Sequence, residues 1–394
     1  MLKYSKQFID QKDIDEVAKV LKSNYLTQGP KIEEFEKKIS KKLNSKYAVV
    51  VNSATSALHI SCLALNLKKN DILWTVPNTF VASANCGLYC GAKVDFVDID
   101  INTFNISLEK LKKKLHAASK NNSLPKIIVP VDFAGNPYDH EGLKKLSIKY
   151  KFRILEDASH AFGTKIGKKL LSPNLGSEIV VFSFHPVKPF TTAEGGVALT
   201  NNKKVYEKLK IFRNHGIIKD KNNLKNKNYS SWYFEQKDLG FNYRMNDLQA
   251  TLGISQLKKL DNFNIKRNKN AKYYLSNLKS KSLTFQFVNK KNFSTYHLFV
   301  ALFPNKKKII NNYDMIFKEF LKNGVNVQLH YQPVHLHPYY RKLGFRKGSF
   351  PVSENYAKRA FSLPNYYLLS RSNQNKVIRV LNKNPEWKAK VIGD

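Results

Sequence analysis

The sequence predicts an α/β protein built on a mostly parallel sheet of seven strands, with a smaller α+β unit towards the C-terminus. Short runs rich in Val, Ile and Phe recur between helix-like stretches, at residues 47–51, 72–76, 94–97, 127–131, 152–155, 179–182 and 197–199. Apolar runs of this length, bounded by Gly, Pro, Asn and Asp, are typical of strands covered by helices on both faces. The segments between most of them are long enough for crossover helices, which parallel neighbours require.

The helix-like segments agree with this fold class. Residues 107–118 open with Ser107, a favourable N-cap, and repeat leucine at helical spacing, and residues 140–150 follow the same pattern. After about Asn246 the pattern changes to a long helix at 247–259, a lysine-rich helical stretch and a strand at 296–303. This change predicts that a large domain ends near residue 250 and a small C-terminal domain follows at 251–394. The polar segment 218–231 reads as a mobile loop, of the kind that often lies near a functional opening.

The composition excludes several classes of function. The 394 residues carry a formal net charge of +37, yet the lysines are spread along the whole chain among asparagines, without an arginine-rich arm. We therefore expect no nucleic-acid partner, and expect the charge to favour a small anionic substrate. The N-terminus lacks an apolar signal region, and no apolar run approaches the roughly 20 residues of a membrane span. These features predict a cytoplasmic protein that makes no membrane contact, and its three cysteines predict buried, inert thiols.

Chemically capable residues follow three of the predicted strands, where open α/β sheets bind their ligands. Residues 52–57 (NSATSA) run from a strand into a helix, which would aim free amides at an anion, although ordinary helix capping explains them equally well. Residues 156–160 (EDASH) and 183–196 (SFHPVKPFTTAEGG) follow two later strands. The sequence contains neither a phosphate-binding loop of the nucleotide type nor a dinucleotide fingerprint, and we predict no metal.

Asp157 and Lys188 are the two strongest candidates for catalysis. Asp157 ends an apolar strand, where a carboxylate needs a cationic partner, and a helix N-cap or a surface lysine could satisfy it as well as a ligand. Lys188 stands between Pro186 and Pro189 just after another strand, where partial burial would lower the pKa of its amine; an exposed lysine is the ordinary alternative. An anion site, a carboxylate and an amine in this order are the three parts that pyridoxal phosphate requires.

Further motifs give the sequence a resemblance to a known family. Besides the three segments above, these motifs are YSK at 4–6, LTQGP at 26–30, GFNYRM at 240–245, residues 327–335 and SLP at 362–364. Together they resemble the nucleotide-sugar aminotransferases of the DegT family, and most of all the transaminases of pseudaminic acid biosynthesis. The resemblance implies the aspartate aminotransferase type I fold, pyridoxal 5'-phosphate, and a homodimer with a shared active site. It also implies three parts: an N-terminal arm at 1–30 that contributes to the active site, a large cofactor-binding domain at 31–250 and a small domain at 251–394.

The resemblance assigns a role to individual residues. Lys188 would hold the cofactor as a Schiff base and then move the proton, Asp157 would pair with the pyridinium nitrogen, and His160 would bond the phenolic oxygen. The phosphate would be bound by Ala54, Thr55 and Ser183 of one subunit, together with Asn242 of the partner subunit. Phe80 would stack on the ring, unless it is a buried core residue. The sugar pocket would be lined by Tyr4, Leu26, Thr27, His330 and Tyr331, and Arg244 would receive the carboxylate of the amino donor unless it is structural.

The same resemblance predicts the reaction. Relatives that remove oxygen carry His in place of the cofactor lysine, so Lys188 indicates transamination. L-Glutamate would donate its amino group to C4 of UDP-2-acetamido-2,6-dideoxy-β-L-arabino-hex-4-ulose, giving UDP-4-amino-4,6-dideoxy-N-acetyl-β-L-altrosamine and 2-oxoglutarate. Two alternatives remain open: an aminotransferase for another UDP- or dTDP-keto sugar, and a binding protein of the same fold that has lost catalysis.

Overall fold

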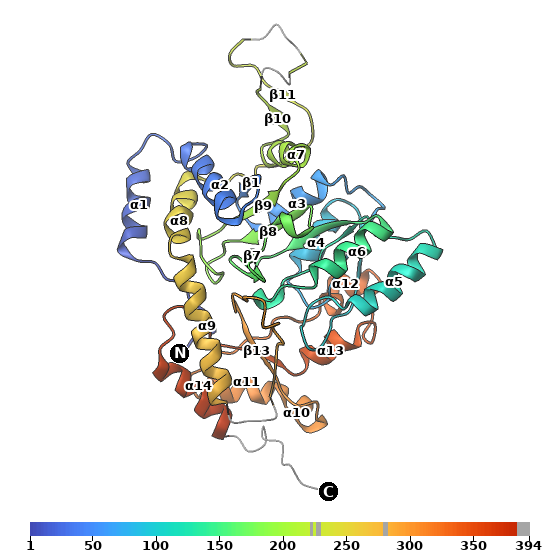
Figure 1. Cartoon of the computed structure of the whole chain (residues 1–394), viewed down its shortest axis with the longest axis vertical. Helices are drawn as coiled ribbons and strands as arrows, with labels where there is room; N and C mark the ends of the chain where they lie inside the picture. The colour runs from blue at the N-terminus through green and yellow to red at the C-terminus, as the bar shows by residue number, and fades with distance from the viewer. Residues whose placement is uncertain (221–223, 226–229, 279–282, 384–394) are drawn as a thin grey trace.

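A seven-stranded sheet forms the centre of the larger part of the molecule (Figure 1). The structure, a computed structural model, describes residues 1–220, 224–225, 230–278 and 283–383. Along the sheet the strand order is β1-β9-β8-β5-β4-β2-β3. The strands are β1 (Tyr47–Val51), β2 (Ile72–Thr75), β3 (Lys93–Phe96), β4 (Ile127–Ile128), β5 (Arg153–Asp157), β8 (Ile179–Ser183) and β9 (Gly196–Thr200). All seven predicted strands are therefore found, and they lie in one sheet.

The direction of the strands decides where the functional segments meet. β2, β3, β4, β5 and β8 pair in parallel, whereas β9 runs antiparallel to both β8 and β1. Because β9 reverses the direction twice, β1 points the same way as β8 and β5. The residues that follow β1, β5 and β8 consequently emerge at one edge of the sheet. This confirms the prediction of a mostly parallel sheet.

Helices cover both faces of the sheet, as the doubly apolar strands predict. In β1, Val49 and Val51 pack into one buried cluster with α3, whereas Ala48 and Val50 pack into another with Phe35 of α2. The expected helices at 107–118 and 140–150 are found, the first beginning after its N-cap Ser107. The helices of this part are α1 (Gln11–Leu21), α2 (Pro30–Leu43), α3 (Ala54–Ala64), α4 (Ala82–Tyr89), α5 (Leu108–Lys120), α6 (His140–Tyr150), α7 (Lys203–Arg213) and α8 (Asp247–Leu257).

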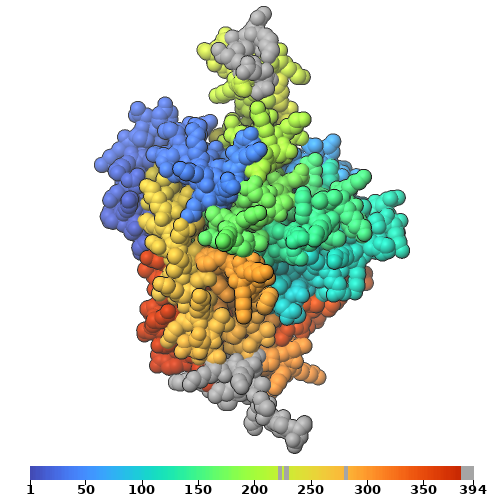
Figure 2. Space-filling model, in the orientation of Figure 1, coloured from blue at the N-terminus to red at the C-terminus, as the bar shows by residue number. Residues whose placement is uncertain are grey.

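The C-terminal part has its own core around a three-stranded antiparallel sheet, β12-β13-β14. The predicted strand at 296–303 corresponds to β13 (Phe299–Leu302). The long helix α9 (Leu260–Asn277) runs from α8 down to this part, which lies below the large sheet in Figure 1. In Figure 2 its orange and red residues gather in the lower part of the molecule. Its other elements are β12 (Thr284–Phe285), α10 (Lys307–Asn311), α11 (Tyr313–Lys322), α12 (Pro338–Lys342), α13 (Pro351–Ala357), β14 (Ala360–Leu363) and α14 (Arg371–Lys383).

Two further hairpins are formed by β6 (Lys165–Ile166) with β7 (Lys169–Leu170), and by β10 (Ile217–Ile218) with β11 (Glu235–Gln236). The second projects away from the body of the molecule (Figure 1). It spans the segment predicted as a loop, of which residues 221–223 and 226–229 lie outside the described residues. Of the helices in the described part, none combines the length and apolar character needed to cross a membrane. The division into an arm, a large domain and a small domain stays a prediction.

Candidate active site

A cavity of about 350 Å³ opens at the edge of the sheet where β1, β5 and β8 end. Its volume is in the range of small-molecule sites. Ten of the residues predicted from the sequence line it: Tyr4, Ala54, Thr55, Phe80, Asp157, His160, Ser183, Lys188, His330 and Tyr331. Segments that lie far apart in the sequence are thus brought to one place by the sheet and by the returning C-terminal part.

An anion site lies at the start of α3, directly after β1. Ser53 caps the helix by accepting a hydrogen bond from the amide of Ser56 (3.1 Å). The first amides of any helix lack partners within the helix, so those of Ala54 and Thr55 face the cavity with a partial positive charge. A Cβ atom at Gly196 would lie 2.5 Å from the Ala54 nitrogen, so glycine in β9 keeps this cradle open. A phosphate group fits these donors.

Lys188 projects into the cavity from the loop after β8. Two distant side chains fix the backbone just before Lys188. The Val187 carbonyl accepts hydrogen bonds from Ser5 Oγ (3.4 Å) and from Arg267 Nη2 (3.5 Å). Desolvation of the amine lowers the pKa of Lys188 to about 8, although the negative charge of Asp157 opposes the shift. At neutral pH a useful fraction of this amine is therefore uncharged and nucleophilic. Lys188 is therefore not the ordinary exposed lysine that the sequence allowed as an alternative.

Asp157 is buried at the end of β5 and held by donors on both oxygens. The Ser83 hydroxyl donates to Oδ2 (2.6 Å), and the Ser159 amide donates to Oδ1 (3.1 Å). The Thr79 hydroxyl lies 2.7 Å from Ser83 Oγ. Ser83 and Thr79 were not among the site residues predicted from the sequence. Their only sequence signal is a hydroxyl pair at helical spacing just after a strand, which is too common to single out.

His160 is buried beside Asp157 and is held in one tautomer. The amide of Ala134 donates to Nδ1 (3.2 Å), so in the neutral ring the proton is on Nε2, which lies 3.1 Å from the Tyr331 hydroxyl. Burial, with the positive charge of Lys188, holds the pKa of His160 well below its usual range. The ring is therefore a neutral donor through Nε2. In this structure that donor faces Tyr331.

His330 and Tyr331 reach the cavity from the segment before α12. Ser362 Oγ lies 2.8 Å from His330 Nδ1, and the Tyr331 amide donates to Asn78 Oδ1 (3.1 Å). Desolvation and the nearby Lys188 charge lower the pKa of His330 to about 3, so the ring is neutral. The Tyr4 ring packs against His330, with ring centres 5.1 Å apart. The motifs at 4–6 and 362–364 thus support one wall of the cavity.

Phe80 forms part of the wall near Tyr331, with ring centres 6.2 Å apart. Its side chain is 57% exposed, so it is not the buried core residue considered as an alternative. An exposed aromatic ring at the mouth of a cavity offers a flat face to a ligand ring.

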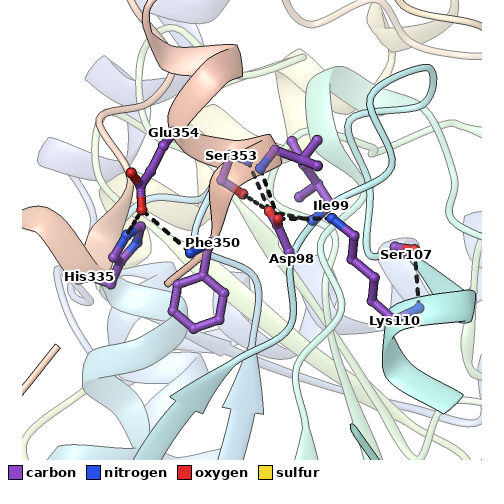
Figure 3. Close-up of polar contacts among 9 residues, drawn as sticks. Asp98, Ile99, Ser107, Lys110, His335, Phe350, Ser353 and Glu354 are labelled. Carbon is purple, nitrogen blue, oxygen red and sulfur yellow. Dashed lines mark hydrogen bonds and ion pairs between the residues drawn. The ribbon is translucent and has the colours of Figure 1, made fainter. Parts of the chain in front are cut away.

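Asp98 fixes the segment that follows His330 and Tyr331 onto the large sheet (Figure 3). It lies just after β3, where Oδ1 accepts the amide and hydroxyl of Ser353 (2.9 and 2.6 Å) and Oδ2 accepts the amide of Val352 (2.9 Å). Lys110 Nζ adds an ion pair to Oδ2 (2.9 Å). On the same segment, His335 Nε2 pairs with Glu354 Oε1 (2.9 Å). One buried carboxylate therefore caps α13 and ties it to the sheet.

We expect Asp98→Asn to lower the free energy of unfolding by about 2 kcal/mol, because the charged hydrogen bonds are lost. Burial raises the pKa of Asp98, but the hydrogen bonds from Ser353 and Lys110 outweigh it, so the folded-state pKa lies below 3.8. The stabilisation is therefore complete at neutral pH, and the difference between wild type and variant shrinks as the pH falls below 3.8. Chemical denaturation at several pH values measures it.

Asp95→Asn is the matched control, since Asp95 lies in β3, the strand that Asp98 follows, and forms a half-exposed pair with Lys114. Exposed pairs contribute about 0–1 kcal/mol, so this variant should unfold nearly as the wild type does. Equal losses in the two variants would contradict the role given to Asp98.

Four of the predicted site residues do not reach the cavity in one chain. Leu26 is 48% exposed, and Thr27 forms an isolated β-bridge with Asn246. Asn242 forms a bridge with Asn214, and Arg244 Nη1 donates to Asn214 Oδ1 (2.6 Å). Arg244 lines a separate cavity of about 850 Å³ between α2 and α7. Leu26, Thr27, Asn242 and Arg244 therefore form no part of the site within a single chain.

Asp132, His140 and Glu156 are residues of metal-binding type whose ligand atoms lie within 4.8 Å of one another beneath β5. His140 Nε2 is already paired with Glu156 Oε1 at 2.8 Å. Burial and the charge of Glu156 raise the pKa of Asp132 well above its usual range, so Asp132 is protonated. We interpret this group as a buried hydrogen-bond network under Asp157.

The cavity as a whole suits pyridoxal phosphate. It combines an anion cradle at the start of α3, a buried carboxylate at the end of β5, and an amine of lowered pKa in the loop after β8. Phe80 offers a ring face, and His160 offers a neutral donor. These groups match, in order, the phosphate, the ring nitrogen, the carbonyl carbon, the ring face and the phenolic oxygen of that molecule.

Comparisons with known proteins agree with this geometry. The model of the DegT/DnrJ/EryC1/StrS aminotransferase family matches residues 7–382. A UDP-4-amino-4,6-dideoxy-N-acetyl-beta-L-altrosamine transaminase of Campylobacter jejuni is 38% identical over 372 residues, 92% of either chain. The structure of Helicobacter pylori PseC, described as an aminotransferase in the biosynthesis of pseudoaminic acid, is 32% identical with a TM-score of 0.88 and covers 97% and 98% of the two chains. A sugar aminotransferase of Streptococcus pneumoniae in its PLP-form is 25% identical, with a TM-score of 0.86 over 96% and 98%.

Proposed function

The chain belongs to the DegT/DnrJ/EryC1/StrS aminotransferase family, and from this premise we propose that it aminates C4 of a UDP-linked 4-keto-6-deoxy sugar. L-Glutamate is the proposed donor, and the products are UDP-4-amino-4,6-dideoxy-N-acetyl-β-L-altrosamine and 2-oxoglutarate. The observation that carries the chemistry is the meeting of Lys188, Asp157 and the start of α3 in one cavity. The name of the 38% identical relative supports the choice of sugar.

We propose that this cavity binds pyridoxal 5'-phosphate. When bound, the cofactor supplies a carbonyl carbon that takes up an amino group and a ring that withdraws electrons. Lys188 Nζ would be the amine that holds that carbon, and in its neutral form it would carry a proton to and from the substrate carbon. Asp157 would face the ring nitrogen and stabilise its positive charge, and His160 would donate to the phenolic oxygen through Nε2. The phosphate binds the amides of Ala54 and Thr55 and the Ser183 hydroxyl.

We propose that the sugar occupies the part of the cavity lined by Tyr4, His330 and Tyr331. The hydroxyls of Tyr4 and Tyr331 stay protonated, since burial raises the pKa of both, so they can donate to sugar oxygens. The net charge of +37 favours the approach of a nucleotide diphosphate.

We further propose a homodimer in which each active site is completed by the second copy. Asn242, Arg244, Leu26 and Thr27 are absent from the cavity of their own chain, and a neighbouring chain could supply them. Asn242 would then bind phosphate, and Arg244 would bind the donor carboxylate. We also propose a cytoplasmic location.

An assay of purified enzyme with glutamate and a panel of UDP- and dTDP-linked 4-keto and 3-keto sugars tests the substrate. We expect turnover of the UDP-linked 4-keto sugar, with the configuration of the new amine at C4 determined by NMR. Activity confined to dTDP sugars or to 3-keto sugars would replace the proposed substrate and leave the cofactor chemistry in place. Failure to take up pyridoxal phosphate would favour the binding protein without catalysis.

A further inference from the structure

Two hydroxyl groups lie beside Asp157: Ser83 at the start of α4 contacts its carboxylate, and Thr79, which lines the cavity, contacts Ser83. Thr79 and Ser83 are 2% and 0% exposed, and each lies within 2.7 Å of the next group in a line that ends at Asp157 Oδ2. Ser83 lies outside the motifs that carry the family resemblance, and Thr79 directly precedes Phe80, to which the resemblance assigns a role. Ser83 lies in the first turn of α4, and Thr79 lies four positions earlier, in the connection that precedes the helix.

The direction of the two hydrogen bonds follows from chemistry. An ionised carboxylate can only accept, so Ser83 must donate its single proton to Asp157. That leaves Ser83 Oγ as the acceptor of its other contact, and Thr79 as the donor. Aligned donors polarise one another, so the Ser83 proton is more acidic than that of an isolated hydroxyl. The 2.6 Å distance is typical of a strong, charge-assisted bond.

We infer that the Thr79–Ser83 relay is a positioning device that keeps Asp157 ionised and aimed, so that the shared proton stays on the cofactor ring nitrogen. The inference rests on the proposed function, in which Asp157 faces that nitrogen. A donor on Oδ2 stabilises the carboxylate form and weakens it as a proton acceptor. With the Ser159 amide on Oδ1, the relay also fixes the carboxylate plane.

The test uses full-length holoenzyme loaded with cofactor labelled with ¹⁵N in the ring. In the wild type the ¹⁵N chemical shift should be that of a protonated ring. In Ser83→Ala we expect the shift to move towards that of the neutral ring, and kcat to fall about tenfold because a hydrogen bond to a charged group is lost, with little change in the KM for glutamate. Thr79→Val, which removes only the outer hydroxyl, should move both quantities in the same direction by less.

Two control variants make the same chemical changes elsewhere. Ser61 and Thr251 are buried, and their hydroxyls have no hydrogen-bond partner within the described part of the chain. Ser61→Ala and Thr251→Val should leave the ¹⁵N shift and kcat unchanged. They report what loss of a buried hydroxyl does to the fold alone.

The possible results distinguish failure of this inference from failure of the proposed function. Wild-type protein that binds no cofactor overturns the proposed function. Wild-type protein that loads the cofactor, while Ser83→Ala leaves the ring ¹⁵N shift where it was, overturns only the relay. If Ser83→Ala does not accumulate as folded protein, Thr79→Val decides by itself, and an unchanged ¹⁵N shift in that variant overturns the relay.

Discussion

Replacing Lys188 by Ala should abolish covalent capture of pyridoxal phosphate and lower transamination by about 10²- to 10⁴-fold through the loss of proton transfer alone. Borohydride treatment of the wild type should attach the cofactor to the peptide that contains Lys188, as mass spectrometry will show. The lowered pKa of about 8 adds a pH dependence. Because the neutral amine is the reactive form, the capture rate should rise with pH to a plateau above about 8.

Lys37→Ala serves as the control, since that lysine is 74% exposed and forms a surface pair with Glu33. It should bind the cofactor and turn over as the wild type does. Capture of the cofactor by the Lys188→Ala protein, or a midpoint near the ordinary lysine value of 10.5, would contradict the role of this amine.

The Lys188→Ala variant also tests whether the active site is shared between two subunits. If Asn242 acts in the site of the partner subunit, a mixed dimer of Lys188→Ala and Asn242→Ala chains contains one site with both lesions and one site with neither. Mixed dimers should then recover activity that neither parent has. Mixtures no more active than their parents would place Asn242 outside the site.

Replacing Asp157 by Asn should give the second large effect. The carboxylate stabilises a positive charge on the ring nitrogen, and an opposite charge at close range shifts a pKa by about 1–3 units. Its removal should lower the pKa of the ring nitrogen by that amount and slow transamination by about 10- to 1,000-fold. The amide keeps the size of the side chain, so cofactor capture at Lys188 should persist. Spectrophotometric titration and single-turnover kinetics measure the two effects.

Asp261→Asn is a suitable control, because Asp261 is 70% exposed and pairs with Lys42, and neither residue lines the cavity. It should leave both measurements unchanged. An Asp157→Asn enzyme with the turnover of the wild type would show that the carboxylate does not serve the ring.

The strands and the order of the chemical groups could be predicted from the sequence because they depend on local patterns. Apolar runs bounded by turn residues identified all seven strands of the large sheet, and Ser107 marked the start of its helix. The edge rule for parallel sheets then placed Ala54, Asp157 and Lys188 near one another. The cavity bears out that placement.

The surroundings of these groups depend on contacts between distant segments, which no local pattern records. Arg267 lies in a lysine-rich helix, and only the packing of α9 brings it to the Val187 carbonyl beside Lys188. Ser83 reaches Asp157 across 74 residues of sequence. Asp98 binds α13 across about 255 residues.

The sequence by itself determined the fold class, the strand ends that carry chemistry, and the family. Only the tertiary structure decided the ionisation of the site, since the lowered pKa of Lys188 and the neutral state of His160 arise from burial and from neighbouring charges. It also separated the residues that one chain gathers from Asn242 and Arg244, which stay outside its cavity. The physical reason is that secondary structure follows from neighbouring residues, whereas desolvation and charge depend on what the whole chain packs around each group.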